Sequence, residues 1–147
     1  MQNCILVPTS HRLSVTEISA STLQLVAVPA RPNSLHLPLR EIHRRYTRGV
    51  NRAHGWTGHL WQGRFASVPM DGAHLAEAVR YVELNPVRAG LVRRPEGWRW
   101  SSASHHLGLR RDLWIPAHLL REAYPDWRVY LDRAPDAAAM DVLRARE

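Results

Sequence analysis

The chain has 147 residues, of which 45% are hydrophobic, and its formal net charge is +7. This composition is typical of one globular domain, and no apolar run approaches the roughly 20 residues that a membrane helix needs. Its single cysteine, Cys4, excludes an intramolecular disulfide. Because the N-terminus has no secretory signal pattern, we expect a cytoplasmic protein that makes no membrane contact.

The positive charge is carried entirely by arginine and is unevenly distributed. Residues 1–111 hold 15 arginines and 6 acidic side chains, whereas residues 112–147 hold 5 arginines and 7 acidic side chains. A GC-rich genome explains arginine in place of lysine, but it does not explain the excess of positive charge. Strongly basic small proteins usually bind nucleic acid or another polyanion. We therefore expect such a partner at the middle of the chain and not at its tail.

The first part of the chain predicts strands followed by a helix. Residues 1–22 show neither a period of 2 nor one of 3.6, although residues 5–7 (ILV) favour one short strand. The apolar run LQLVAVP at 23–29 predicts a buried strand, and the ARPNS stretch that follows it predicts a loop. Residues 38–54 predict a helix that stops at Gly55.

The two sides of the predicted helix over 38–54 differ in character. One side carries apolar residues at helical spacing, which we expect to face a core: Leu39, Ile42, Tyr46 and Val50. The opposite side carries arginines four residues apart: Arg40, Arg44, Arg48 and Arg52. Four like charges in a row repel each other, and a bound polyanion would relieve that repulsion. The arginine row is therefore a candidate nucleic-acid contact.

The segment 55–70 predicts a turn and one or two extended segments. It mixes aromatic and polar side chains: Trp56, Trp61, Gln62, Arg64 and Phe65. Such a mixture can stack on unpaired bases and contact their phosphates. A tryptophan-rich hairpin packed on its own domain explains the pattern equally well.

A second helix is predicted from about residue 72 to Asn85, with Asp71 as its cap and Pro86 disfavouring its continuation. One more helical turn can follow and end at Gly90. Ser101 or Ser102 can cap a short helix, and the tail is expected to be helical with a break near Pro125. The buried side of the second helix is expected to consist of Leu75, Ala78, Val79 and Val82.

Tyr81 lies off that apolar side and shares roughly one helix face with Glu77, Asn85 and Arg88. A tyrosine hydroxyl can attack a phosphodiester and form a covalent phosphotyrosine link, which keeps the bond energy for resealing. A tyrosine that packs its ring in the core and keeps its hydroxyl in water fits the same spacing. The spacing alone favours this structural role.

The nine histidines contain no His-x-His pair, the spacing that places two metal ligands on one face of a strand. His105 and His106 are adjacent and would point to opposite sides of a strand. HExxH, P-loop and Cys-x-x-Cys motifs are also absent from the sequence. We therefore expect ordinary surface or core histidines at His36, His43, His54, His59, His74 and His118.

Two blocks, GHLWQGRFASVPM at 58–70 and RYVELNPVRAGLVRRPEGWRWSS at 80–102, resemble the REP-associated tyrosine transposases, a branch of the single-tyrosine HUH transposases. HRRYTRGVN before them fits the same pattern, and the resemblance extends from about Leu23 to Leu107. It implies an α+β, ferredoxin-like fold whose transposase-like core covers residues 23–110. Residues 1–22 would be an atypical segment that leaves the sheet incomplete, and residues 111–147 a helical C-terminal extension. A homodimer would be one way to complete the sheet.

The resemblance also implies a function on single-stranded or hairpin DNA. Tyr81 matches the nucleophile, which would form a 5′-phosphotyrosine with the help of Mg²⁺ or Mn²⁺. Thr22 and Gln24 stand where the family has its two histidines, so Gln24 and Asn85 are weak metal-ligand candidates. The chain is thus expected either to cleave and rejoin DNA or to be a non-catalytic, DNA-binding remnant of a transposase. Besides the arginine row, the DNA contacts would come from Trp61, Gln62, Arg64 and Arg88.

Overall fold

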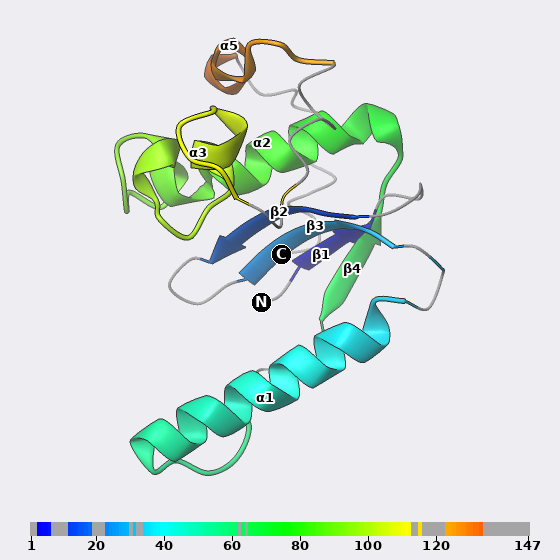
Figure 1. Cartoon of the computed structure of the whole chain (residues 1–147), viewed down its shortest axis with the longest axis vertical. Coiled ribbons are helices and arrows are strands. Elements are labelled where there is room, and N and C mark those ends of the chain that lie inside the picture. The colour runs from blue at the N-terminus through cyan, green and yellow to red at the C-terminus, as the bar shows by residue number, and fades with distance from the viewer. Residues whose placement is uncertain are drawn as a thin grey trace.

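The computed structural model describes most of the chain between Asn3 and Arg133. It shows an α+β architecture, in which one sheet has a long helix on one face and the remaining helices on the other (Figure 1). Among the described residues, no helix is long and apolar enough to cross a membrane. The described residues are 3–6, 12–18, 23–29, 31, 34–61, 63, 65–112, 115 and 123–133.

The sheet has four strands in the order β2-β3-β1-β4. β1 lies between β3 and β4 and is parallel to both, whereas β2 and β3 form an antiparallel pair. The expectation of a sheet left incomplete at the N-terminus is wrong, because residues 1–22 supply two of these strands. These two strands remove the reason for which a homodimer was expected, and the homodimer itself stays a prediction. The strands are β1 (Asn3–Leu6), β2 (Arg12–Ile18), β3 (Leu23–Val28) and β4 (Ala66–Pro69).

A register shift in β2 explains why its sequence lacks a strand period. Leu13 pairs with Ala27 and Val15 pairs with Val26, so Ser14 is an extra residue on one strand of the pair. Such a β-bulge interrupts the alternation of side chains on which recognition of a strand from its sequence depends.

Strand β3 separates the two layers of the core. Val26 packs in a cluster with α2 (Gly72–Arg88), and Gln24 bonds to the same helix. Leu25 and Ala27 instead pack with Leu39 of α1 (His36–His54). Successive side chains of a strand point to opposite faces, so α1 and α2 lie on opposite sides of the sheet, as Figure 1 shows.

Helix α1 occupies nearly the predicted residues, but it packs on the sheet only near its N-terminus. Leu39 is its buried residue, whereas Ile42 and Tyr46 are 54% and 56% exposed. The expectation that these two side chains face a core is wrong, because the helix continues past the sheet (Figure 1). Most of its circumference is therefore open to solvent.

Helix α2 begins as predicted, since the Asp71 side chain accepts a hydrogen bond from the backbone N–H of His74 at 3.1 Å. It does not end before Pro86, but continues to Arg88. Pro86 lies two residues before the end of the helix, so the backbone donor that it lacks affects only the last turn. The predicted extra turn is therefore part of the same helix, and Gly90 follows it with a φ of 69°.

The described part of the tail belongs to the same core as α2. Trp127, Tyr130 and Leu131 of α5 (Trp127–Asp132) are buried in the cluster that contains Val26 and Val79. Helix α5 begins at Trp127 with Asp126 as its N-cap, which agrees with the predicted break near Pro125. Two further short elements, η1 (Pro95–Gly97) and α3 (Ala103–His106), precede it.

Candidate nucleic-acid interface

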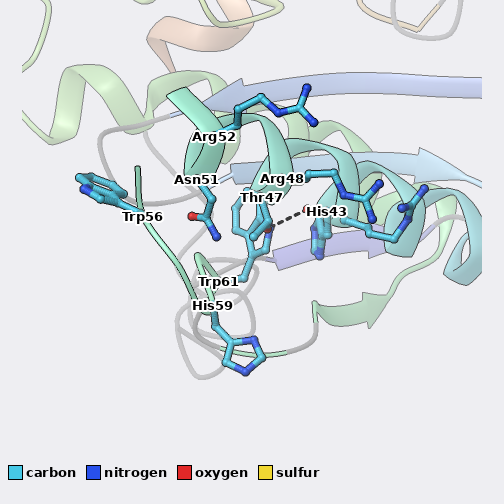
Figure 2. Close-up of a pocket in the computed structure, with 9 residues that line it drawn as sticks. His43, Thr47, Arg48, Asn51, Arg52, Trp56, His59 and Trp61 are labelled. Carbon is cyan, nitrogen blue, oxygen red and sulfur yellow. Dashed lines mark hydrogen bonds between the residues drawn. The ribbon is translucent and has the colours of Figure 1, made fainter. Parts of the chain in front are cut away.

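An open groove runs along the C-terminal part of α1, between this helix and the loop that follows it (Figure 2). Its volume is about 620 Å³. Arginines of α1 and tryptophans of the loop meet here, so two features that were predicted separately belong to one surface. We call this surface the α1 groove; it is lined by His43, Arg44, Thr47, Arg48, Asn51, Arg52, Trp56, His59 and Trp61.

The loop that forms one wall of the α1 groove is fixed to the helix at two levels. Helix α1 ends at Gly55, whose φ of 67° is left-handed and favours glycine. The backbone carbonyl of Asn51 then accepts a hydrogen bond from the backbone N–H of Trp56 at 2.9 Å. The Asn51 side chain donates from Nδ2 to the Gly58 carbonyl at 3.1 Å. Further along, Trp61 Nε1 donates to the His43 carbonyl at 3.4 Å. The wall is thus held in place before any ligand binds.

The two tryptophans of the groove have different environments. Trp61 is half-buried and stacks on His43 with 4.6 Å between ring centroids. Burial lowers the pKa of His43, which favours its neutral form. Trp56 stacks on His54 at 4.7 Å and remains 58% exposed. Trp61 is therefore part of the wall, and Trp56 offers a ring surface to a ligand.

The cations of the groove also differ in what they contact. Arg44 and its neighbour Arg45 both donate to the Glu41 carboxylate, and these bonds lower the pKa of Glu41 to about 2. Arg48 and Arg52 are exposed and form no ion pair with a described carboxylate, and Figure 2 shows both side chains projecting from α1. These two guanidinium groups are the available positive charges of the groove.

The other residues predicted to contact DNA either do not line the α1 groove or lie outside the described residues. Arg40 is exposed on α1 and continues the arginine row, but it does not line the groove. Gln62 and Arg64 lie outside the described residues. Phe65 packs against the core on the α1 side of the sheet, and Arg88 lies on α2, beyond the sheet.

Tyr81 is buried on α2, with 6% of its surface exposed, and belongs to the core cluster that contains Val26, Val79 and Val82. The expectation that it lies off the buried side of its helix is wrong. Helix α2 is enclosed by the sheet on one side and by α3 and α5 on the other, so residues around most of its circumference are buried. The Arg88 guanidinium carbon lies 3.8 Å from the centre of the Tyr81 ring and covers it further.

The two weak metal-ligand candidates do meet, but they bond to each other. Asn85 Nδ2 donates to Gln24 Oε1, and Arg88 Nη2 donates to Asn85 Oδ1. Both carboxamides are thereby engaged, and a guanidinium occupies the position beside them where a divalent cation would be repelled. The described residues also contain no cluster of three histidine, cysteine or acidic side chains. These residues do not fit a Mg²⁺ or Mn²⁺ site, and Thr22 lies outside the described residues.

No family model matches the chain, and no curated protein or solved structure matches it. The resemblance to REP-associated tyrosine transposases therefore stays a prediction that depends on the two sequence blocks. What the protein binds has to be inferred from the geometry of its own surfaces.

The sequence analysis did not predict a buried polar cluster around Glu83. The Glu83 carboxylate is fully buried and accepts bonds from Ser102 Oγ at 2.8 Å, Trp127 Nε1 at 2.8 Å and His106 Nδ1 at 2.5 Å. It thus connects α2 with α3 and α5. His106 is buried in the core, and its partner Glu83 is 23 positions away in the sequence, so no local signal marks the pair.

Arg80 has a similar structural role next to Glu83. It is 5% exposed, and its Nε donates to the carbonyls of Tyr130 and Leu131 at 3.1 and 3.2 Å. Tyr130 in turn donates its hydroxyl to Glu77 at 2.6 Å, and burial together with this carboxylate raises the pKa of Tyr130. Through Arg80 and Glu83, the RYVE portion of the second block therefore holds α5 against α2.

Proposed function

We propose that this protein binds single-stranded nucleic acid in the α1 groove and does not need catalysis to do so. One observation carries the proposal: the groove combines two available arginines with an exposed tryptophan on a preformed wall. Arginine pairs with phosphate through a rigid fork of donors, and an exposed indole can stack on an unpaired base. The resemblance to transposases that act on hairpins favours DNA as the natural ligand.

The groove suits a single strand better than a duplex. Bases in a duplex are stacked on each other and cannot reach the Trp56 ring, whereas a hairpin loop or a free strand presents them. Arg48 and Arg52 are one helical turn apart, a spacing of about 6 Å that is similar to the distance between successive phosphates of an extended strand. A strand along α1 can therefore place phosphates at the arginines and a base at Trp56.

Binding without cleavage follows from where the tyrosine lies. Tyr81 is in the core on the far side of the sheet from α1, so a strand in the α1 groove does not reach it. The residues at the expected metal positions are bonded to each other, which supports the non-catalytic alternative.

The proposal is tested by titrating the ¹⁵N-labelled protein with a short oligothymidine and measuring affinity by fluorescence anisotropy. We expect amide and indole shifts at residues 43–61. Trp56→Ala should weaken binding about fivefold or more, since stacking contributes about 1–3 kcal/mol per base. Arg45→Ala is the matched control, because Arg45 lies on the same helix outside the groove. Shifts confined to other parts of the chain would overturn the proposal.

A second candidate is DNA cleavage by Tyr81 in a ferredoxin-like transposase fold. It is favoured by the convergence of Tyr81, Asn85 and Arg88 with Gln24 of the central strand β3. The described elements run β-β-β-α-β-α, in contrast to the β-α-β-β-α-β order of a ferredoxin-like fold, and β4 is parallel to β1. Incubation with hairpin DNA and Mn²⁺ should then give a covalent adduct that is absent in Tyr81→Phe. An adduct of equal yield in both proteins would exclude this candidate.

A further inference from the structure

A second basic surface lies on the opposite side of the sheet from the α1 groove. Residues 88–111 contain six arginines and one acidic residue, Glu96, whose carboxylate accepts a bond from Arg128 at 2.8 Å. With the adjacent Asp112 counted as well, residues 88–112 hold six arginines and two acidic residues, so this region has an excess of positive charge. We call the part around α3 the α3 surface; it consists of Arg99, Trp100, Arg110 and Arg111.

Within the α3 surface, Arg99 lies over an exposed indole and Arg110 bonds to the Arg99 backbone. Trp100 is 51% exposed, and the Arg99 guanidinium carbon lies 4.2 Å from its ring centre. Arg110 Nη1 donates to the Arg99 carbonyl at 3.3 Å, which brings the two ends of this region together. A cation next to an exposed aromatic ring is the same combination that characterises the α1 groove.

The α3 surface is also held from within the protein. Ser102, two residues from Trp100, bonds to the buried Glu83. The Ser104 hydroxyl donates to the Glu96 carbonyl at 2.9 Å, and the Ser104 carbonyl accepts the backbone N–H of Arg110 at 3.0 Å. The surface is thus a preformed platform, and binding a ligand there does not require the loops to become ordered first.

We propose that the α3 surface is a second nucleic-acid site, which takes a different segment of strand from the one in the α1 groove. This inference rests on the proposed function, because both sites would use an arginine and an exposed tryptophan on the same class of ligand. Since the sheet separates the two surfaces (Figure 1), one short oligonucleotide cannot occupy both. The protein is therefore a clamp that holds two single-stranded segments at once.

The test counts the oligonucleotides bound to the full chain by native mass spectrometry. With an oligothymidine of about six nucleotides, near the lower end of known site sizes, we expect two per protein. The variant Arg99→Ala/Arg110→Ala/Arg111→Ala and the groove variant Arg48→Ala/Trp56→Ala should each retain one. Arg31→Ala, which changes an exposed arginine outside both surfaces, should retain two.

A second variant separates binding from loop stability, because Arg110 also bonds to the Arg99 carbonyl. Trp100→Ala leaves this bond and all arginines in place, and it should weaken the second binding event about fivefold or more. In addition, donor- and acceptor-labelled oligonucleotides should show energy transfer on the wild-type protein and not on either multiple variant.

The outcomes distinguish this inference from the proposed function. If the triple α3 variant and Trp100→Ala bind two oligonucleotides with wild-type affinity, the second site is refuted and the α1 groove stands. If the groove variant keeps wild-type binding and the α3 variants lose it, the α1 groove is refuted and the α3 site stands. One oligonucleotide per wild-type protein would overturn the clamp.

Discussion

Replacing Glu41 by glutamine is expected to strengthen nucleic-acid binding. The Glu41 carboxylate accepts bonds from Arg44 at 2.8 and 2.6 Å and from Arg45 at 2.7 Å. Its pKa of about 2 keeps it ionised at any pH used for binding. Of the two arginines only Arg44 lines the groove. Glutamine has nearly the same shape without the charge, so the substitution frees one guanidinium for a phosphate.

The magnitude follows from counterion release. Each phosphate contact to a single strand steepens the slope of log K against log salt by about 0.7. Two contacts, at Arg48 and Arg52, give a slope of about −1.4, and a third contact at Arg44 makes it about −2.1. Between about 50 and 200 mM salt, the affinity of the groove should fall about 7-fold, and that of the Glu41→Gln variant about 18-fold.

Fluorescence anisotropy with a labelled oligothymidine measures this slope. The series is best run in the Arg99→Ala/Arg110→Ala/Arg111→Ala background, so that only the α1 groove contributes. Arg45→Ala is the control, since it leaves the Arg44–Glu41 pair intact and should not change the slope. An unchanged slope in Glu41→Gln, or weaker binding at low salt, would refute the idea that Glu41 neutralises a groove cation.

Three further predictions concern stability and metal. Glu83→Ala should lower the free energy of unfolding by about 3–5 kcal/mol, because three buried donors lose their acceptor; urea unfolding with a loss below about 1 kcal/mol would contradict this. Stability should fall as pH drops below about 6.5, because burial lowers the folded-state pKa of His43 and the unfolded chain takes up the proton first. Thermal unfolding at several pH values should show a smaller decrease in His43→Gln, and equal decreases would count against it. Oligonucleotide affinity should be the same with Mg²⁺ and with a chelator at equal ionic strength, so a requirement for metal would contradict the assignment of Gln24 and Asn85.

Local sequence signals predicted the elements whose packing is also local. The buried strand at 23–29, the helix stop at Gly55 and the Asp71 cap each depend on neighbouring residues, and the structure confirms them. Strand β2 could not be predicted, because its bulge breaks the alternation that marks a strand. The bulge exists only in relation to β3, so it is a property of the pairing and not of the segment.

The candidate site shows the same division. Helical spacing predicted the arginine row, because residues four apart are neighbours on any helix. Spacing did not show that Arg44 forms an ion pair with Glu41. It also did not show that Trp61 contacts His43, which is 18 residues away in the sequence. Nor could it show that α2 is enclosed on both sides, which places Tyr81 in the core. An apolar stripe indicates one buried side of a helix, but it does not exclude that another side of the same helix is buried as well.

The position of β1 has a consequence for how the chain folds. Among the described strands, this strand of four residues comes first in the sequence, yet it alone joins β3 to β4, which ends at Pro69. The edge of β1 that pairs with β4 therefore stays unpaired until more than sixty further residues have been synthesised and folded into position. Folding of the sheet should be slow for a chain of this size, because its closing contacts are so distant in sequence. Deleting residues 3–6 should divide the sheet into two pieces that no longer unfold together.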